Sequence, residues 1–378
     1  MSTLPSVGRQ LRSLVSQDGR LELCLEEVEV APPQEDEVLV RVEAAPINPS
    51  DLGALLAGCD IAKGKSSGSE DKTVFQAPIS PLKMEKLSSR IDRSMPVGNE
   101  GAGVVIAAGK SDEAQAMIGK TVGMIGGSMY SEYRTLSIQQ CLLMNDGVSS
   151  RDAAACFVNP QTVLGMIETM RDEGFSGLVH TAAASNVGLM LQRLCLAENI
   201  PLVNVIRKPE QEKLLNDIGA TYVCDSSKGS FPSDLKDAVL EAQAYIAFDA
   251  TGGGRLACDV LTAMEQASLA KGSQYSRYGS AQHKQVYIYG GLEPSPTVLN
   301  RTYGMQWGIG GWLLGPFLQK IGPERKLKLR RRVADEILTT FASNYSKVVS
   351  LGGALSKEAV SEYSKQSTGQ KYLVSPSL

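Results

Sequence analysis

The sequence predicts an α/β protein with a β-rich part and a part in which helices cover both faces of a parallel sheet. Residues 1–150 alternate apolar with polar side chains and are punctuated by Gly and Pro turns, which is typical of half-buried strands. From about residue 151, short apolar strands alternate with amphipathic helices, as in a doubly wound parallel sheet. The 378 residues are enough for two domains that each bury a core.

In the first part, the alternation predicts strands at 11–17, 20–30, 37–47, 101–109 and 120–127. Residues 60–94 interrupt the pattern, because they begin with the polar run KGKSSGSEDK and show little periodicity. Connections of this length are usually functional or disordered. We therefore expect a long loop or lid over residues 60–94.

In the second part, a helix is expected to begin near Ser150, and strands and helices then alternate. The expected strands are 177–181, 201–206, 222–224, 244–250 and 285–289, and the expected helices are 187–197 and 209–218. Gly219 suits the end of the latter helix. A basic helix from Arg325 to about Ser346 and a strand at 372–374 are expected to complete the chain.

The composition excludes several classes of protein. Lys and Arg total 38 against 41 Asp and Glu, so the net charge of −3 argues against a nucleic-acid partner. Seven cysteines without a CxxC pair argue against a disulfide scaffold and favour a reducing cytoplasm. Two histidines are too few for a multi-histidine metal site. No secretory signal or membrane span is expected.

The segment 178–188, LVHTAAASNVG, joins a predicted strand to a predicted helix through small residues. Such a turn directs helix N-terminal amides at a pyrophosphate and lets the backbone approach it. The residues expected to line the pyrophosphate are Ala183, Ser185, Asn186, Val187 and Gly188. The segment lacks the full GxGxxG pattern, so an ordinary turn with small residues for packing remains the alternative.

Arg207 and Lys208 follow the second predicted strand, with Arg207 nineteen residues after Gly188. Sites specific for NAD usually place an acidic residue here to bind the ribose 2′-hydroxyl. A cationic pair suits a 2′-phosphate instead. The sequence therefore favours NADPH, with solvated basic residues at a strand end as the alternative.

Two glycine clusters follow later strands of the same predicted sheet. Thr251 and Gly252 follow one strand, and Tyr289 and Gly290 follow another. Ligands of open α/β sheets bind at the carboxyl ends of the strands. We expect these four residues to border the nicotinamide half of the cofactor, although glycine clusters also occur as plain turns.

Several motifs together resemble the medium-chain dehydrogenase/reductase superfamily, in its zinc-independent NADPH:quinone oxidoreductase and enoyl reductase branch. They are INPSD at 47–51, GNEGAG at 98–103, FVNPQTVLG at 157–165 and AAASNVG at 182–188. The resemblance implies a GroES-like catalytic domain of residues 1–150 and 313–378, with the insertion 60–94, and a Rossmann-type NADPH-binding domain of residues 151–312. It also implies a homodimer and cofactor contacts from Asn159 and Thr162.

The chain departs from the zinc-containing members of that superfamily. Asn48 and Asn99 stand where those members carry a Cys and a His that bind the catalytic metal. A catalytic zinc needs about three protein ligands. No metal is therefore expected.

The resemblance also suggests catalytic positions. Asn48 is expected to face the acceptor, unless it only forms an Asn-Pro turn. Cys59 stands where enoyl thioester reductases carry a Tyr, although a small buried residue is the alternative. For an enone acceptor, Tyr289 is a candidate proton donor, as are Tyr275 and Tyr278.

The expected activity is hydride transfer from NADPH to a small-molecule quinone or a related α,β-unsaturated carbonyl, because the cofactor carries the chemistry and the protein positions it. Two alternatives stay open. The first is a 2-enoyl thioester reductase, and the second is a non-catalytic NADPH-binding protein of the same fold.

Overall fold

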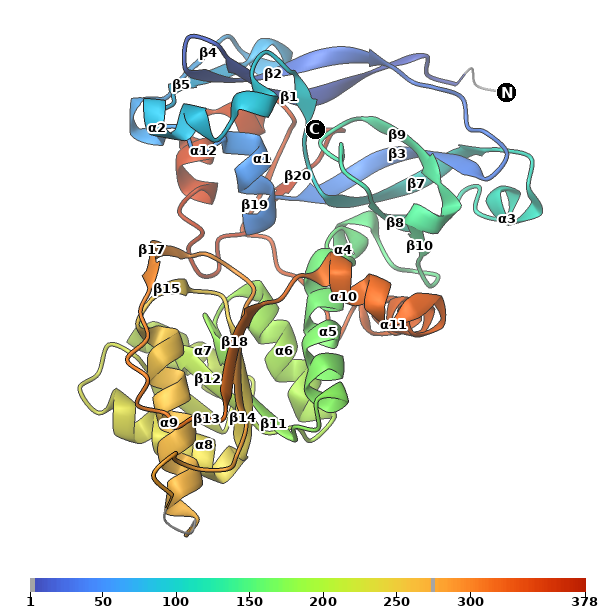
Figure 1. The fold of residues 1–378 in the computed structure, drawn as a ribbon. Helices are drawn as coiled ribbons and strands as arrows, with labels where there is room; N and C mark the ends of the chain where they lie inside the picture. Colours follow the sequence, from blue (N-terminus) through green and yellow to red (C-terminus); the bar gives the residue numbers. More distant parts are fainter. Residues whose placement is uncertain (1–3, 273–275) are drawn as a thin grey trace. The chain divides into compact units, whose positions relative to one another are not determined.

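The computed structural model describes residues 4–272 and 276–378, and the chain divides into two compact units (Figure 1). Unit 1 comprises Met1–Val158 and Arg330–Leu378, and unit 2 comprises Asn159–Leu329. The expected boundaries, 150/151 and 312/313, lie 8 and 17 residues earlier. The later return to unit 1 has a physical reason: Arg325 is 2.6 Å from Glu168 and 3.1 Å from Asp172 of unit 2, so the residues around it belong there.

Unit 1 is built mainly from antiparallel strands in two sheets, in the orders β4-β5-β2-β1-β6 and β10-β8-β7-β3-β20-β19, with β9 also paired to β3. The strands are β1 Val7–Ser16, β2 Arg20–Glu29, β3 Glu37–Pro46, β4 Lys65–Ser67, β5 Val74–Pro78, β6 Met95–Pro96, β7 Glu100–Ala108, β8 Thr121–Ile125, β9 Tyr133–Ser137, β10 Cys141–Leu143, β19 Lys347–Val349 and β20 Tyr372–Val374. The α-helices are α1 Leu52–Leu56, α2 Pro81–Glu85, α3 Asp112–Gln115, α4 Ser150–Ala153 and α12 Lys357–Tyr363. The 3₁₀ helices are η1 Pro49–Asp51, η2 Ile61–Lys63, η3 Glu70–Lys72, η4 Ser88–Arg90, η5 Ile138–Gln140 and η6 Gly353–Leu355.

The expectation of a long loop at 60–94 is wrong, because the segment folds into short elements: strands β4 and β5 of the first sheet, helix α2, and the 3₁₀ helices η2, η3 and η4. Strand β5 pairs with β2, which places Phe75 opposite Leu23, and both side chains are fully buried. Strand β4 lies at the edge of the sheet with all three residues exposed, so its side chains are polar and show no alternation. The polar composition of the segment therefore reflects an edge strand rather than a lid.

Unit 2 holds a six-stranded sheet in the order β13-β12-β11-β14-β16-β18, and every pair in it is parallel. Its strands are β11 Gly177–Thr181, β12 Leu202–Ile206, β13 Tyr222–Asp225, β14 Ala244–Asp249, β16 Lys284–Ile288 and β18 Trp307–Gly311, and β15 Gly252–Gly254 pairs separately with β17 Glu293–Thr297. The strand order reverses between β11 and β14, which is the topological switch point where doubly wound sheets bind ligands.

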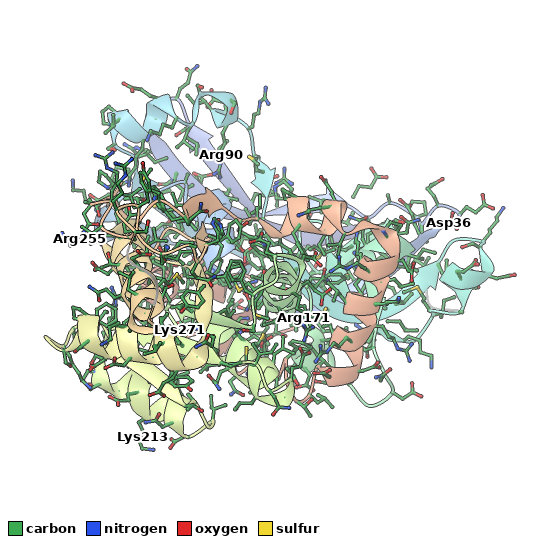
Figure 2. All side chains as sticks on the ribbon, turned by 60° about the horizontal axis from the view of Figure 1, so that its bottom comes forward. Asp36, Arg90, Arg171, Lys213, Arg255 and Lys271 are labelled. Carbon is green, nitrogen blue, oxygen red and sulfur yellow. The ribbon has the colours of Figure 1, made fainter. Side chains whose placement is uncertain are left out.

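Helices cover both faces of this sheet, as the alternating pattern predicts (Figure 1). They are α5 Val158–Asp172, α6 Asn186–Ala197, α7 Pro209–Asn216, α8 Phe231–Ala242 and α9 Leu256–Ala270. Two helices follow β18, α10 Leu314–Lys320 and α11 Gly322–Glu336, and Arg325 of α11 pairs with Glu168 of α5. One apolar cluster packs α8 and α9 against the sheet. A smaller cluster contains Ala183 from the turn before α6, Ile206 from β12 and Leu215 from α7, and it packs the turn and α7 against the sheet. Charged side chains such as Lys213 of α7 extend from the surface (Figure 2).

Helix α11 ends at Glu336, about ten residues before the expected Ser346. No described helix is both long and apolar enough to cross a membrane. Within the same described residues, no three His, Cys, Asp or Glu side chains gather closely enough to hold a metal ion.

Candidate functional site

The carboxyl edge of the unit 2 sheet gathers most of the residues expected to bind a cofactor. The strands are parallel and in register, so their ends lie at one edge. The segments that follow the strands are Ala182–Ser185 after β11, Arg207 and Lys208 after β12, Ala250 and Thr251 after β14, and Tyr289 and Gly290 after β16. The sequence-based placement of these residues at strand ends therefore matches the structure.

The turn after β11 is tight. Ala182 has a φ of +52°, in the left-handed region that a non-glycine residue adopts at a cost. Ser185 is the N-cap of α6, and its Oγ accepts the Gly188 N–H at 3.1 Å. A Cβ added at Gly188 would lie 2.0 Å from the Ala183 carbonyl oxygen. Gly188 is therefore required for the close approach of helix α6 to the turn.

This turn fits a phosphate group. Ala183 is buried in the turn, and Asn186 and Val187 form the first two positions of α6. The Val187 N–H has no acceptor among the described residues, and it lies where the helix dipole favours an anion. A pyrophosphate placed there would accept from this amide.

Arg207 and Lys208 are exposed at the end of β12. The Arg207 backbone N–H donates to Gln211 Oε1 at 3.1 Å, so the side chain is not needed to hold the turn. Hydrogen bonds from Ser295 lower the pKa of Glu293, and the Arg207 charge contributes to the same shift. Arg207 therefore has a carboxylate in its neighbourhood that a bound 2′-phosphate would have to outcompete.

Asp249, at the end of β14, is a residue that the sequence-based reasoning missed. Its Oδ1 accepts from Thr181 Oγ1 at 2.6 Å and from the Thr251 N–H at 2.8 Å, and its Oδ2 accepts from the Gly252 N–H at 3.0 Å. It is 1% exposed. Asp249 therefore fixes the two strands that flank the switch point. The only sequence signal was an acidic residue at the end of an apolar strand.

Gly252 and Gly290 lie where the segments that follow β14 and β16 pack closely against each other. A Cβ on Gly252, which has a φ of +78°, would lie 2.6 Å from the Gly290 carbonyl oxygen, and one on Gly290 would lie 2.6 Å from the Ala250 oxygen. Chain packing alone thus explains both glycines. Their expected role beside the nicotinamide stays a prediction, as does that of Thr251.

Tyr289 contacts His180 of β11. Its hydroxyl is 2.8 Å from His180 Nε2, and the rings stack at a centroid distance of 5.8 Å. Burial lowers the pKa of His180 to about 3, so the imidazole is neutral, and burial also raises the pKa of Tyr289. The phenol is therefore a weak acid in the free protein.

The other two candidate tyrosines differ from Tyr289. Tyr278 is 56% exposed and stacks with Arg277 at 4.6 Å from the ring centroid. Tyr275 lies outside the described residues. Tyr289 is thus the candidate with a defined environment.

Asn159 and Thr162 lie in the first turns of α5, and both are buried. A four-residue connection links α5 to β11, and the helix runs antiparallel to that strand. The start of α5 therefore lies at the level of the carboxyl edge of the sheet. Their contact with a cofactor stays a prediction.

Asn48 belongs to a buried polar cluster in unit 1. Its Nδ2 donates to Glu100 Oε1 at 2.7 Å, and Glu100 Oε2 accepts the N–H groups of Phe157 and Val158 at 2.8 Å each. Asn48 is 1% exposed, and its Oδ1 has no hydrogen-bond partner among the described residues. An amide thus occupies the position expected to face the acceptor, and it is oriented by a carboxylate.

Asp51 and Lys371 complete this cluster. Asp51 accepts the Asn48 N–H and the Asn99 N–H, each at 2.8 Å. Burial raises the pKa of Asp51 to about 7 and lowers the pKa of Lys371 to about 8, while the charges of Glu100 and Asp51 favour the protonated lysine. The INPSD and GNEGAG motifs contain Asp51 and Glu100, whereas Lys371 had no sequence signal.

Cys59 lies in the apolar core of unit 1 and is 7% exposed. Burial raises the pKa of its thiol to about 11, so the thiolate that a nucleophile requires is scarce near neutral pH. The surroundings are those of a small core residue. A catalytic role for Cys59 stays a prediction.

Comparisons with known proteins agree with this architecture, although no family model matches the chain. A quinone oxidoreductase of Pseudomonas aeruginosa is 26% identical over 159 residues, which are 41% of this chain and 49% of that protein. A mitochondrial enoyl-[acyl-carrier-protein] reductase of Caenorhabditis elegans is 30% identical over 215 residues, or 53% of each chain. The chain therefore spans about half the length of these curated relatives.

A crystal structure of a candidate NADPH:quinone reductase from Mesorhizobium loti superposes with a TM-score of 0.73. The match covers 99% of this chain and 100% of that one at 24% identity, which shows the fold. A GroES-like β-rich domain and a Rossmann-type domain are thus confirmed. The relatives and the solved structure that resemble this chain are thus quinone oxidoreductases and enoyl reductases, the proteins of the branch that the sequence motifs also resemble.

Proposed function

We propose that this protein is an NADPH-dependent oxidoreductase that transfers hydride to a quinone or a related α,β-unsaturated carbonyl. The observation that carries the proposal is the carboxyl edge of the unit 2 sheet. There, the Val187 N–H at the start of α6 has no acceptor within the described part of the chain, and two exposed cations follow the next strand. The similarity to reductases of quinones and enoyl groups supports the same chemistry.

The protein's contribution is to bind and orient the dinucleotide. The Val187 amide and the dipole of α6 receive the pyrophosphate, and Arg207 with Lys208 pairs with the 2′-phosphate. Thr251, Gly252 and Gly290 border the nicotinamide half. The bound nicotinamide supplies the hydride.

A quinone suits this site because its reduced oxygen can take a proton from solvent. Tyr289 and the neutral His180, which contact each other at the sheet edge, offer only a weak acid. Asn48 presents an amide rather than a metal ligand. These features favour a metal-free reaction without a strong general acid.

The alternative acceptor is a 2-enoyl thioester, which the similarity to an enoyl reductase favours. Residues 52–97 contain no tyrosine, so a proton donor of the kind expected there is missing from this segment. A non-catalytic NADPH-binding protein would keep the nucleotide site and turn over neither acceptor.

We also propose that the protein acts as a homodimer in the cytoplasm. All seven cysteines are free, which suits a reducing compartment. Strand β18 is the last strand of its sheet, so one edge has unpaired backbone groups that a second copy could pair with.

The acceptor is tested by following NADPH oxidation with phenanthrenequinone and with a 2-enoyl-CoA under identical conditions. Turnover of the quinone alone would support the proposal. Turnover of the thioester alone would overturn the quinone assignment, and NADPH binding without either turnover would favour the non-catalytic alternative.

The cofactor assignment is tested by Arg207→Ala. An Arg paired with a phosphate contributes roughly 1.5–3 kcal/mol, so the KM for NADPH should rise about 10- to 150-fold. The KM for NADH should change little. Lys271→Ala, at the far end of α9, is the charge control. Equal changes for both cofactors would contradict the 2′-phosphate role.

A further inference from the structure

A cavity in unit 1 lies at the end of the 60–94 segment. Its volume is about 590 Å³, within the range of small-molecule sites. It is lined by Lys86, Leu87, Ser89, Arg90, Arg93, Ser94 and Met95. Three of these seven residues are cationic and none is acidic.

Arg90 is the unusual member of this lining. It is 8% exposed, and among the described residues no carboxylate lies within ion-pair distance of it. Its guanidinium donates to Ser13 Oγ at 2.6 Å and to the Gly53 carbonyl oxygen at 3.4 Å, while Nε has no partner among those residues. Burial lowers its pKa, with no nearby charge acting against that shift.

A buried cation without an acidic partner is costly, because desolvation is not offset by attraction to an opposite charge. Proteins tolerate such a group where a ligand provides the missing charge. Two hydrogen bonds to neutral oxygens hold Arg90 in place, but they do not neutralise it. An anion bound in the cavity would offset this cost.

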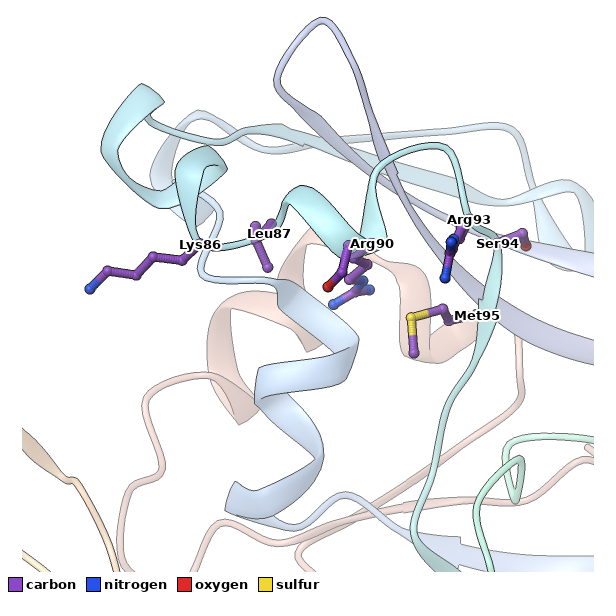
Figure 3. A pocket seen from close by; sticks show the side chains of 7 residues that line it. Lys86, Leu87, Arg90, Arg93, Ser94 and Met95 are labelled. Atoms are coloured by element: carbon purple, nitrogen blue, oxygen red, sulfur yellow. The ribbon is translucent and has the colours of Figure 1, made fainter.

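Arg93 places a second guanidinium along the same wall. Figure 3 shows Arg90 and Arg93 on the same wall, with Met95 beneath Arg93, whereas Lys86 points away from both. Neighbouring acids have other partners: Glu26 accepts from Ser94 Oγ at 2.7 Å and lies 3.5 Å from Arg12, and Asp92 accepts the Gln17 N–H at 3.2 Å. Two guanidinium groups that form no ion pair among the described residues match a dianion better than a single carboxylate.

Apolar side chains complete the wall. Leu87 packs beside Arg90, and Met95 is 36% exposed. Leu87 and Met95 offer apolar surface to an organic group attached to the anion. Because the Gly53 carbonyl bound by Arg90 belongs to α1, the cavity is linked through that helix to the Asn48 and Asp51 cluster.

We propose that this cavity binds a phosphorylated small molecule, whose phosphate pairs with Arg90 and Arg93 and whose organic part contacts Leu87 and Met95. The site lies wholly in unit 1 and does not depend on the proposed cofactor site. The phosphate could belong to a free phosphorylated metabolite or to a coenzyme A thioester. Both sources present the same chemistry to the two arginines.

The test is calorimetric titration of pyrophosphate into the protein saturated with NADPH. Pyrophosphate should bind, and Arg93→Gln should weaken it at least tenfold, whereas Lys72→Gln on the same segment and Arg207→Ala at the cofactor edge should leave it unchanged. Arg90→Gln should have a similar effect to Arg93→Gln. Arg93 is exposed, and its one hydrogen bond among the described residues runs from its backbone N–H to the Arg90 carbonyl oxygen at 3.2 Å, so a side-chain substitution leaves that bond in place. The Arg93→Gln variant therefore stays informative if Arg90→Gln fails to fold.

The outcomes separate the two sites. Loss of pyrophosphate binding in Arg207→Ala but not in Arg93→Gln would overturn the proposal, as would no binding to the parent protein. Displacement of pyrophosphate by coenzyme A would assign the phosphate to an acyl carrier. Absence of displacement with retained pyrophosphate binding would assign it to a free phosphorylated molecule.

Discussion

Replacing Gly188 by Ala is the sharpest test of how this chain builds the turn before α6, where we propose that the nucleotide binds. The added Cβ would lie 2.0 Å from the Ala183 oxygen, 2.5 Å from its carbonyl carbon and 2.8 Å from its Cα. All three are backbone atoms, so no side chain can move aside. Ordinary contact begins at 3.4 Å, so the start of α6 must move by about 1.4 Å.

The expected cost follows from that shift. Overpacking costs about 1–3 kcal/mol, and loss of the Ser185 cap on the Gly188 N–H adds about 1 kcal/mol. The higher helix propensity of Ala returns about 1 kcal/mol. The free energy of unfolding should fall by about 1–3 kcal/mol, which for a unit of this size lowers the Tm by about 2–12 °C.

Cofactor binding should suffer as well, because the Val187 amide moves with the start of the helix. Loss of one hydrogen bond to a charged phosphate corresponds to about tenfold or more in the Kd for NADPH. Thermal unfolding by circular dichroism and NADPH fluorescence titration measure the two effects. Gly229→Ala is the matched control, since an added Cβ there meets nothing within 4 Å. If both variants behave alike, the steric reasoning is refuted.

Three further predictions address other parts of the molecule. Glu265→Gln should lower the free energy of unfolding, measured by denaturant titration, by about 3–5 kcal/mol. The Lys284 ammonium lies 2.6 Å from the Glu265 carboxylate, and the variant leaves that ammonium buried without an opposite charge. A decrease below about 1 kcal/mol would argue against this reasoning. Because burial raises the pKa of Asp51 to about 7, the folded state binds more protons than the unfolded chain between about pH 4 and 7, so the stability contributed by this group falls as the pH rises through that window. Asp51→Asn should flatten that slope, and parallel pH profiles for the two proteins would contradict the assignment. Chelators should leave NADPH oxidation unchanged and elemental analysis should find less than one metal per chain, whereas one zinc per chain would overturn the argument from Asn48 and Asn99.

Much of unit 2 could be predicted from sequence because the pattern there is local. Strand β11 was predicted at 177–181 and spans Gly177–Thr181, and helix α6 was predicted to begin one residue after its observed start at Asn186. Apolar runs bounded by small residues and glycine report directly on a strand buried on both faces.

The 60–94 segment shows where this reasoning fails. An edge strand exposes nearly all its side chains, so β4 shows no alternation and cannot be distinguished from a loop by composition. Strand β5 is buried only because β2 pairs with it, and that pairing joins residues about fifty positions apart. Helix α11 ends at Glu336 and not near Ser346 as expected, because the run of basic residues carries no signal for the last turn of a helix.

The sequence by itself determined strands β11, β12, β13, β14 and β16 and helices α6 and α7 of unit 2, the turn that contains Gly188, and the exposed cationic pair Arg207 and Lys208. These depend on residues close together in the chain. Only the tertiary structure decided that Asp249 fixes the switch point, that Asn48 binds Glu100, and that Arg90 is buried without an acid. Each of these depends on contacts between distant segments and on burial. Burial sets both the pKa of a group and the free-energy cost of its charge. The local spacing of residues encodes neither the long-range contacts nor the burial.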